Sequence, residues 1–477
     1  MAARFGTLPR TAAAIARRPY LGPSRLRSPI QIPTFTSRFA STTSYAPPKE
    51  PTLSQELLVP HYRSFLRLLL AGTVGALVVS YLYDSRAAVH ELVIMPLVHK
   101  TMDPEEAHRL AIWLAKNGLS PVERGSPDDK LLEVHLFGKT LKNPIGLAAG
   151  FDKNGEAIDG MFDMGFGIVE IGSVVPRPQP GNPKPRMFRL SPDTACINRY
   201  GMNCAGFDDI EARLRSRVRS YLRAHPDIHL ATSPSSVAEE LAPLGASRSL
   251  RGGRMLGINL ARNKGQPSDS NDDYVEGVHR MGPYADYVVL NVSCPNQHGI
   301  TSMQRKGIME GLMKEIIEAR NATLPHRPPV LVKLSPDLDD AELADVARAV
   351  VDAGVDGVII SNTTNQRPSS LKSDPKITSE WGGLSGPPLK PLSLHTIRTF
   401  RRLTSGAVPI VGCGGILTGA DALEYARAGA SAIQLYTGMA FDGPGVVARI
   451  KREVKEELGK MGKTWEEVVG NDAVGSR

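Results

Sequence analysis

The chain has 477 residues of ordinary globular composition, enough for one barrel of ~250 residues plus additional segments. Its formal net charge of +8 does not indicate nucleic-acid binding, because residues 1–49 contain seven Arg and one Lys but no acidic residue, so the remaining chain is neutral overall. The four cysteines show no CxxC spacing, which argues against a zinc site or a disulfide framework and favours reduced thiols.

The N-terminus has the composition of a targeting segment. Residues 1–45 are rich in Arg, Ser, Thr and Ala and lack acids, which is typical of a mitochondrial presequence; a disordered basic tail is the alternative. An uncharged stretch, 68–83, follows and is extended by Phe65 and Leu66. Because a membrane-spanning helix needs about 17–25 residues, we predict a transmembrane helix over 65–83, with a buried core helix as the alternative.

Residues 87–120 are predicted to form a small amphipathic two-helix extension. Asp103 followed by Pro104 is a strong helix start, and Leu110, Trp113 and Leu114 give that helix an apolar face. Beside a membrane anchor, two such helices suggest a piece that dips into the bilayer surface; a simple helical cap on the barrel is equally compatible.

From residue 131 to about 460, strand signals alternate with helical stretches, which favours an α/β fold with a parallel sheet. Helical patterns lie at 307–322, 339–353, 392–403 and 419–428. The eight strand candidates are 145–150, 168–173, 256–260, 287–291, 330–334, 357–361, 408–412 and 432–436. Eight β/α units predict a closed (β/α)8 TIM barrel, and a doubly wound open sheet is the second choice.

Each strand candidate ends in a polar or glycine-rich cluster. In such barrels the active site lies at the carboxyl ends of the strands, and the last two loops commonly bind phosphate. The run NVSCPN at 291–296 adds a thiol and two carboxamides, which suit a planar ligand with C=O and N–H groups. We therefore expect a phosphate-bearing cofactor and a planar substrate at this end of the barrel.

Two segments interrupt the repeat. The Pro-rich, basic excursion from 181 to 203 contains Phe, Tyr and Arg and is predicted to be ordered and functional. Residues 223–253 are dominated by Ser, Ala, Pro and Gly and are predicted to form a flexible surface insertion.

Ten motifs carry a family resemblance: AAGFDK, EIGSV, GNPKPRMFRL, INRYGMN, NVSCPN, VKLSPD, SNTT, GGLSG, GCGGI and QLYTG. Together they closely resemble dihydroorotate dehydrogenase over about residues 87–455, and the presequence and anchor match its membrane-bound, quinone-dependent mitochondrial class. The resemblance implies oxidation of dihydroorotate to orotate in pyrimidine biosynthesis, with FMN as hydride acceptor and ubiquinone as final acceptor. It also implies a single-pass protein of the mitochondrial inner membrane whose barrel faces the intermembrane space.

The resemblance also implies residue roles, and no metal. The catalytic base is Cys294. The FMN-binding residues are Ala148, Ala149, Gly150, Lys153, Ser173, Asn259, Asn291, Lys333, Ser361, Ser385, Gly386, Gly414, Gly415, Tyr436 and Thr437. The substrate-binding residues are Lys153, Asn198, Arg199, Tyr200, Gly201, Met202, Asn203, Asn291, Asn296, Asn362 and Thr363. The quinone tunnel involves His108, Arg189 and Tyr436.

Cys294 gives a mixed class signal, because the membrane-bound class usually has Ser at the base position and Cys is typical of the soluble class. One alternative is therefore a soluble-class dihydroorotate dehydrogenase that uses fumarate or NAD, although the anchor argues against it. A second is a Schiff-base lyase, since Lys153 and Lys333 both follow strands. A third is a non-catalytic, membrane-tethered barrel that binds a metabolite.

Overall fold

The computed structural model describes residues 55–125, 128–228, 240–245, 247–267, 270–293 and 306–473. The predicted presequence, the predicted base Cys294 and the predicted substrate residue Asn296 lie outside these residues. Of the predicted insertion 223–253, residues 229–239 and 246 also lie outside them, whereas Arg248 and Ser249 are buried. The described C-terminal part of that segment is therefore packed into the fold.

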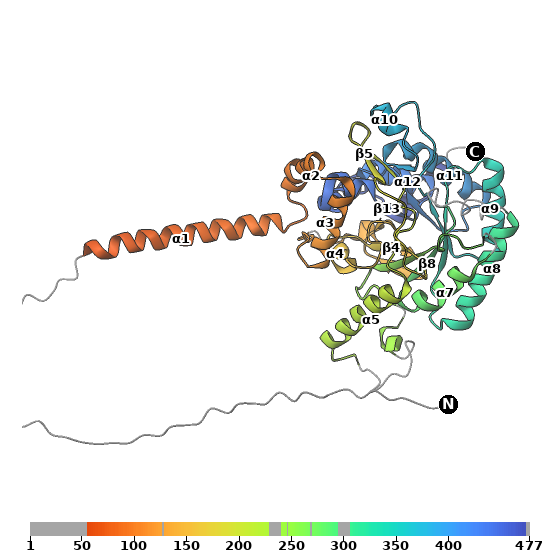
Figure 1. Cartoon of the computed structure of the whole chain (residues 1–477), viewed down its shortest axis with the longest axis horizontal. Coiled ribbons are helices and arrows are strands. Elements are labelled where there is room, and N and C mark those ends of the chain that lie inside the picture. Colours follow the sequence, from red (N-terminus) through yellow and green to blue (C-terminus); the bar gives the residue numbers. More distant parts are fainter. Residues whose placement is uncertain are drawn as a thin grey trace, which may run out of the picture. The chain divides into compact units, whose positions relative to one another are not determined.

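A closed barrel of eight parallel strands confirms the predicted fold class (Figure 1). The strands follow one another around the barrel in chain order, and the last strand pairs with the first. This closure rules out the open-sheet alternative. They are β3 (Ile145–Leu147), β4 (Ile168–Val174), β7 (Met255–Leu260), β8 (Tyr287–Asn291), β9 (Val330–Leu334), β10 (Gly357–Ile360), β12 (Ile410–Cys413) and β13 (Ala432–Leu435). Nearly every residue in them is buried, as expected for strands with the barrel interior on one face and helices on the other.

Amphipathic helices surround the barrel and shield its outer face (Figure 1). They are α4 (Ile158–Asp163), α5 (Phe207–Ala224), α7 (Asp272–Met281), α8 (Lys306–Thr323), α9 (Asp340–Ala353), α11 (Lys390–Leu403), α12 (Gly419–Ala428) and α14 (Val446–Met461). Helix α9 illustrates how local sequence sets the boundaries. Asp339 and Glu342 form a reciprocal capping box at its start, and Gly354 ends it with a left-handed φ of 70°.

The excursion between β4 and β7 is ordered, and it builds a second, antiparallel sheet that the sequence did not predict. Strands β5 (Met187–Leu190) and β6 (Ala195–Asn198) form a hairpin, and β11 (Gly383–Ser385) pairs with β6 from the far end of the chain. Leu190, Ala195, Ile197 and Leu384 form the apolar core of this sheet. The sheet brings the end of β6 and β11 to the same cavity as the barrel strand ends.

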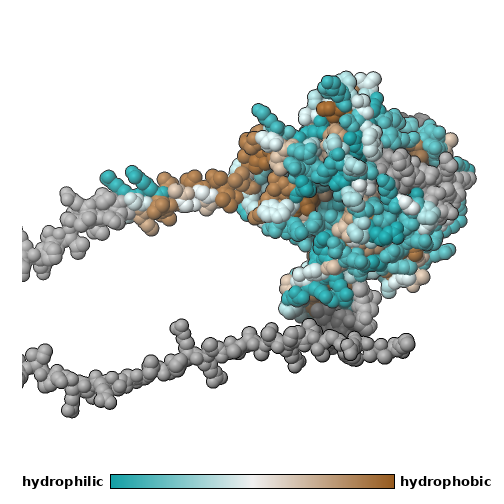
Figure 2. Space-filling model, viewed as in Figure 1, coloured by the Kyte–Doolittle hydropathy of each residue, from teal (hydrophilic) through white to brown (hydrophobic). Residues whose placement is uncertain are grey.

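The helices before the barrel carry the apolar surface. Helix α1 (Gln55–Leu82) contains the stretch Tyr62–Leu82, which is long and apolar enough to cross a membrane and has no buried residue. A π-helical turn (His90–Ile94), α2 (Met95–Thr101) and α3 (Pro104–Lys116) follow, and Asp103 caps α3 as predicted. Apolar side chains gather on the surface of these helices (Figure 2). The exposed ones are Leu92, Val93, Leu97, Leu110, Trp113 and Leu119.

Candidate active site

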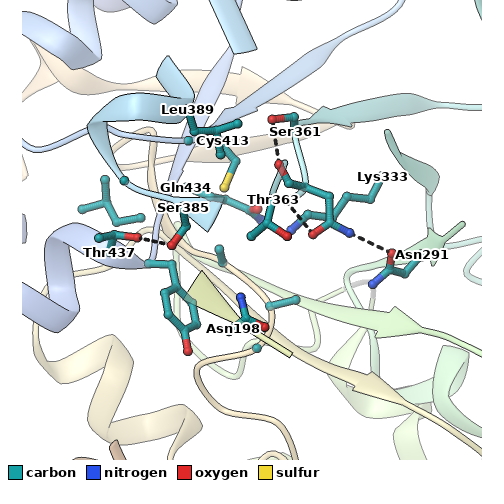
Figure 3. Close-up of a pocket in the computed structure, with 18 of the residues that line it drawn as sticks. Asn198, Asn291, Lys333, Ser361, Thr363, Ser385, Leu389, Cys413, Gln434 and Thr437 are labelled. Carbon is teal, nitrogen blue, oxygen red and sulfur yellow. Dashed lines mark hydrogen bonds between the residues drawn. The ribbon is translucent and has the colours of Figure 1, made fainter. Parts of the chain in front are cut away.

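The first cavity lies at the carboxyl ends of the barrel strands, where the clusters after each strand converge (Figure 3). It gathers fourteen of the fifteen residues predicted to bind the cofactor, all except Asn259. From the predicted substrate set it gathers Lys153, Asn198, Tyr200, Gly201, Met202, Asn291, Asn362 and Thr363. These residues are spread over about 290 positions of the sequence. They share one cavity because the parallel strands of a barrel all present their carboxyl ends on the same side.

Two of the predicted substrate residues do not line this cavity. Arg199 turns away from it: its Nη1 lies 2.5 Å from a carboxylate oxygen of Glu380, and its guanidinium stacks on Phe188 and Trp381. The Arg199 charge is thus paired outside the cavity, and its role as a substrate ligand stays a prediction. Asn203 is also absent from the lining.

Three glycines form a bare backbone wall on one side of the cavity. Gly386, Gly414 and Gly415 all have positive φ, between +69° and +129°. A Cβ on Gly415 would lie 2.7 Å from the Gly386 carbonyl oxygen, and one on Gly386 would lie 2.7 Å from that of Thr194. Only glycine fits here, and its bare N–H groups suit a phosphate.

A cluster of amides and hydroxyls forms the floor of the cavity. Asn291 Nδ2 donates to Ser173 Oγ at 2.8 Å, and Asn362 Nδ2 donates to Ser293 Oγ at 3.1 Å. Lys333 on β9 is buried beside them, and no acidic side chain of the described residues forms an ion pair with it. The floor thus offers hydrogen-bond donors, acceptors and one positive charge to a planar ligand.

Lys153 stands at the opposite wall. Its ammonium group lies 4.1 Å from the centroid of the Tyr200 ring, and Arg186 stacks on that ring at 5.1 Å. Burial raises the pKa of the Tyr200 hydroxyl well above its ordinary value, so Tyr200 stays neutral under these two cations. The arrangement holds the Lys153 ammonium over the cavity, where a carboxylate can approach it.

A second cavity, of about 350 Å³, lies beside α2 and α3 and is largely apolar. The predicted tunnel residues His108, Arg189 and Tyr436 all line it. Arg189 Nη1 donates to the His99 carbonyl oxygen at 3.0 Å, and His99 Nε2 lies 3.1 Å from the Ala440 carbonyl oxygen. Burial lowers the pKa of His99.

His108 and Tyr436 connect the two cavities. Tyr436 lines both of them, and its ring centroid lies 6.4 Å from that of His108. His108 Nε2 lies 2.7 Å from the Phe151 carbonyl oxygen, and burial lowers the His108 pKa to about 4. At neutral pH the imidazole is therefore uncharged, and the Tyr436 beside it contributes to the lining of both the polar and the apolar cavity.

Six lining residues were not among the predicted site residues: Leu389, Cys413, Ile416, Gln434, Leu435 and Gly438. Gln434 Oε1 and Thr363 Oγ1 are buried, and neither atom has a hydrogen-bond partner among the described residues. A polar residue in the middle of the buried strand AIQL was the available signal for Gln434. Both orphaned atoms belong to residues that line the first cavity, so a bound ligand can satisfy them.

Among the described residues no three His, Cys, Asp or Glu side chains come together as a metal site.

Comparison with known proteins agrees with this geometry. The family model for dihydroorotate dehydrogenase matches residues 131–458. A Schizosaccharomyces pombe protein named dihydroorotate dehydrogenase (quinone), mitochondrial is 47% identical over 392 residues, covering 82% of this chain and 87% of the relative. A Mus musculus protein of the same name is 45% identical, covering 80% of this chain and 89% of the relative.

A solved structure of the dihydroorotate dehydrogenase from Eimeria tenella, in complex with ferulenol, superposes with a TM-score of 0.69 at 38% identity. It covers 80% of this chain and 99% of its own. The chain therefore belongs to the dihydroorotate dehydrogenase family, in its quinone-dependent mitochondrial class.

Proposed function

We propose that this chain oxidises dihydroorotate to orotate in the first cavity, with FMN as its flavin, and that ubiquinone collects the electrons in the second. The chain is an oxidoreductase of pyrimidine biosynthesis, and the names of its relatives support a quinone as the acceptor. The single observation that carries the proposal is Tyr436, which lines both cavities and so brings a polar cofactor site next to an apolar acceptor site.

The residues present fit FMN. The backbone wall of Gly386, Gly414 and Gly415 suits the phosphate, and the unpartnered oxygens of Gln434 and Thr363 can meet polar ring atoms. When bound, FMN supplies the acceptor for a hydride from the substrate. The Lys333 ammonium, buried in the floor, stabilises negative charge that develops at the flavin site.

The substrate is proposed to lie between the Lys153 wall and the amide floor. Its carboxylate faces the Lys153 ammonium, which Tyr200 holds in place. Its ring carbonyl and N–H groups face Asn198, Asn291 and Asn362, since each carboxamide offers both a donor and an acceptor. Binding on both sides fixes the ring in one plane, which aligns the C5 proton and the C6 hydride for removal.

Cys294 remains the proposed base that removes the C5 proton, and Asn296 a proposed substrate ligand. Both lie outside the described residues, directly after Ser293. Ser293 is buried and accepts the hydrogen bond from Asn362, so the segment that carries Cys294 starts at the floor of the cavity. A thiol has an ordinary pKa of ~8.5 and therefore needs less activation than a hydroxyl to act as a base.

The location is proposed to be the mitochondrial inner membrane, with one transmembrane helix and the barrel in the intermembrane space. Mitochondrial relatives and the apolar helix at 62–82 support a mitochondrial membrane-associated protein. The exposed apolar side chains of α2 and α3 lie on the helices that line the second cavity, so a lipid-soluble quinone can enter from the bilayer (Figure 2).

The test is a pair of anaerobic half-reactions on the full-length protein in detergent. Dihydroorotate is added first while the flavin absorbance is followed. A short-chain ubiquinone, fumarate or NAD is then added to separate samples. Bleaching by dihydroorotate and recovery with the quinone alone is the expected result.

Other outcomes identify the competing functions. Recovery with fumarate or NAD but not with quinone would assign a soluble-type acceptor despite the apolar helix. A colourless protein that does not take up FMN, and that loses activity when borohydride is added with substrate, would indicate a Schiff-base lyase. Binding of orotate without turnover would indicate a metabolite-binding barrel.

A further inference from the structure

A buried carboxylate lies inside the barrel beneath the first cavity, and the proposed mechanism does not use it. Glu170, in the middle of β4, is 0% exposed and forms no ion pair with the described residues. Its Oε1 accepts a hydrogen bond from Asn259 Nδ2 at 2.9 Å. Its Oε2 accepts from Gln434 Nε2 at 2.7 Å and from the Tyr287 hydroxyl at 3.0 Å. A buried charge without a cation is costly, so this ring of three donors from β7, β8 and β13 is a built environment.

The bond to Asn259 is the first of a continuous series that runs into the cavity. Asn259 Oδ1 accepts from the Ser173 hydroxyl, and Ser173 Oγ in turn accepts from Asn291 Nδ2 at 2.8 Å. Asn291 Oδ1 then faces Asn362 Nδ2 at 3.3 Å. The last three side chains of this series line the cavity, whereas Glu170 and Asn259 do not.

The bond directions from Glu170 as far as Asn291 follow from the first member of this series. A carboxylate can only accept, so Asn259 must turn its NH2 group towards Glu170 and its oxygen towards Ser173. The Ser173 hydroxyl has a single hydrogen, which Asn259 then takes, so Ser173 can only accept from Asn291. The NH2 group of Asn291 is thereby committed to Ser173, and its oxygen to Asn362. Two backbone N–H groups support the same direction: Ser293 N donates to Asn291 Oδ1 at 3.4 Å, and Thr363 N donates to Asn362 Oδ1 at 2.8 Å.

We propose that Glu170 is a positioning residue: through Asn259 and Ser173 it fixes the donor and acceptor direction of Asn291 in the amide floor, and so the recognition of the planar orotate ring. The inference rests on the proposed function, because it assumes that Asn291 and Asn362 face that ring. A reversed amide would turn an oxygen towards a ring carbonyl and an NH2 group towards a ring N–H. Both contacts are repulsive, so Glu170 acts on ligand binding without touching the ligand.

The test measures how tightly orotate binds to the full-length holoprotein in detergent and to three variants of it. Binding is monitored through the change in the oxidised flavin spectrum as orotate is titrated in. Glu170→Gln keeps the shape but offers an NH2 group, so Asn259 and, through Ser173, Asn291 are no longer held in one direction by a carboxylate. We expect orotate affinity to fall by about tenfold or more. The KM for dihydroorotate should rise in parallel, while the KM for a short-chain ubiquinone should stay unchanged.

Two controls separate bond direction from damage to the core. Tyr287→Phe removes a neutral donor from Glu170 but leaves the carboxylate facing Asn259, so orotate affinity should match that of the parent. Asp286→Asn also neutralises a buried carboxylate, but this one accepts from the backbone N–H groups of Arg248 and Leu256 at the amino end of β8. It should lower thermal stability without changing orotate affinity.

Unchanged orotate affinity in Glu170→Gln would overturn the proposal, and so would an equal loss in either control. If Glu170→Gln does not fold, Ser173→Ala interrupts the same series without loss of a charge. Parental orotate affinity in that variant would overturn the proposal as well. A parent protein that does not bind orotate at all would instead overturn the proposed function.

Discussion

Glu105 on α3 holds the guanidinium of Arg186 through two hydrogen bonds, of 2.9 Å and 3.1 Å, and both side chains are about 10% exposed. Arg186 also donates to the carbonyl oxygens of Pro180 and Asn182 and stacks on Tyr200. This pair therefore ties the helix beside the second cavity to the segment that forms a wall of the first.

We expect Glu105→Gln to destabilise the protein by roughly 3 kcal/mol, because removal of one partner leaves the buried Arg186 charge uncompensated. The KM for dihydroorotate should rise as well, since Tyr200 and the Lys153 above it lose their support. Thermal unfolding and steady-state kinetics measure the two effects.

Glu106→Gln, one position further along α3, is the matched control. Glu106 is 59% exposed at its side chain and lies 3.8 Å from Arg109, so its loss should change stability by less than about 0.5 kcal/mol. Equal melting temperatures for the two variants would show that the Glu105–Arg186 pair does not hold the two segments together.

His108 should make stability depend on pH. Burial lowers its pKa from 6.5 to about 4, so between these values the unfolded chain binds more protons than the folded protein. Stability attributable to His108 is therefore complete above pH 6.5 and falls as the pH drops towards 4. Each pKa unit corresponds to ~1.4 kcal/mol, which sets an upper limit of about 3 kcal/mol for this group.

The measurement is the free energy of unfolding from pH 4 to 7 for the parent and for His108→Phe, which removes the titrating ring. The variant should show a shallower slope over this range. His395→Asn, on the exposed face of α11, is expected to keep the slope of the parent. A parental slope in His108→Phe would mean that other groups cause the acid sensitivity.

The sequence predicted the barrel because each strand is a local signal: a buried apolar run that ends in glycine or polar residues. It could not predict the β5–β6–β11 sheet, since Ser385 pairs with Cys196 across nearly 190 positions of sequence. Nor could it predict that Arg199 pairs with Glu380, which is similarly distant in the sequence. Non-local pairing of this kind leaves no periodic pattern in either segment.

Most of the site was also predictable, because motifs at the strand ends carried it. Glu170 and Gln434 were not singled out, although each is a polar residue within an apolar strand. Such a residue interrupts the apolar run of a strand only once, and its role depends on the four strands that meet around it. That arrangement exists only after the barrel has closed.

Removal of residues 1–84 should release the protein from membranes. The deletion removes α1, whose segment 62–82 has no buried residue, so the barrel should keep its fold and its reduction by dihydroorotate. Flotation with liposomes measures the release, and deletion of residues 1–49, which retains α1, is the control. If the 1–84 deletion floats as efficiently as the control, the exposed side chains of α2 and α3 suffice for membrane binding.

Cys294 can be tested by separating the two half-reactions. Cys294→Ala should slow flavin bleaching by dihydroorotate by about 10²–10⁴-fold, the usual contribution of a general base, and leave reoxidation by ubiquinone unchanged. Cys294→Ser should retain substantial activity with an optimum at higher pH, because a hydroxyl loses its proton less readily than a thiol.

The matched control for Cys294 is Cys204→Ser, a buried thiol that accepts hydrogen bonds from the backbone N–H groups of Val175 and Gly206. A hydroxyl can accept the same bonds, so this variant should reduce its flavin at the parental rate. If Cys294→Ala bleaches as fast as the parent, another group removes the C5 proton. The departure of Cys294 from the Ser usual in the membrane-bound class would then carry no chemistry.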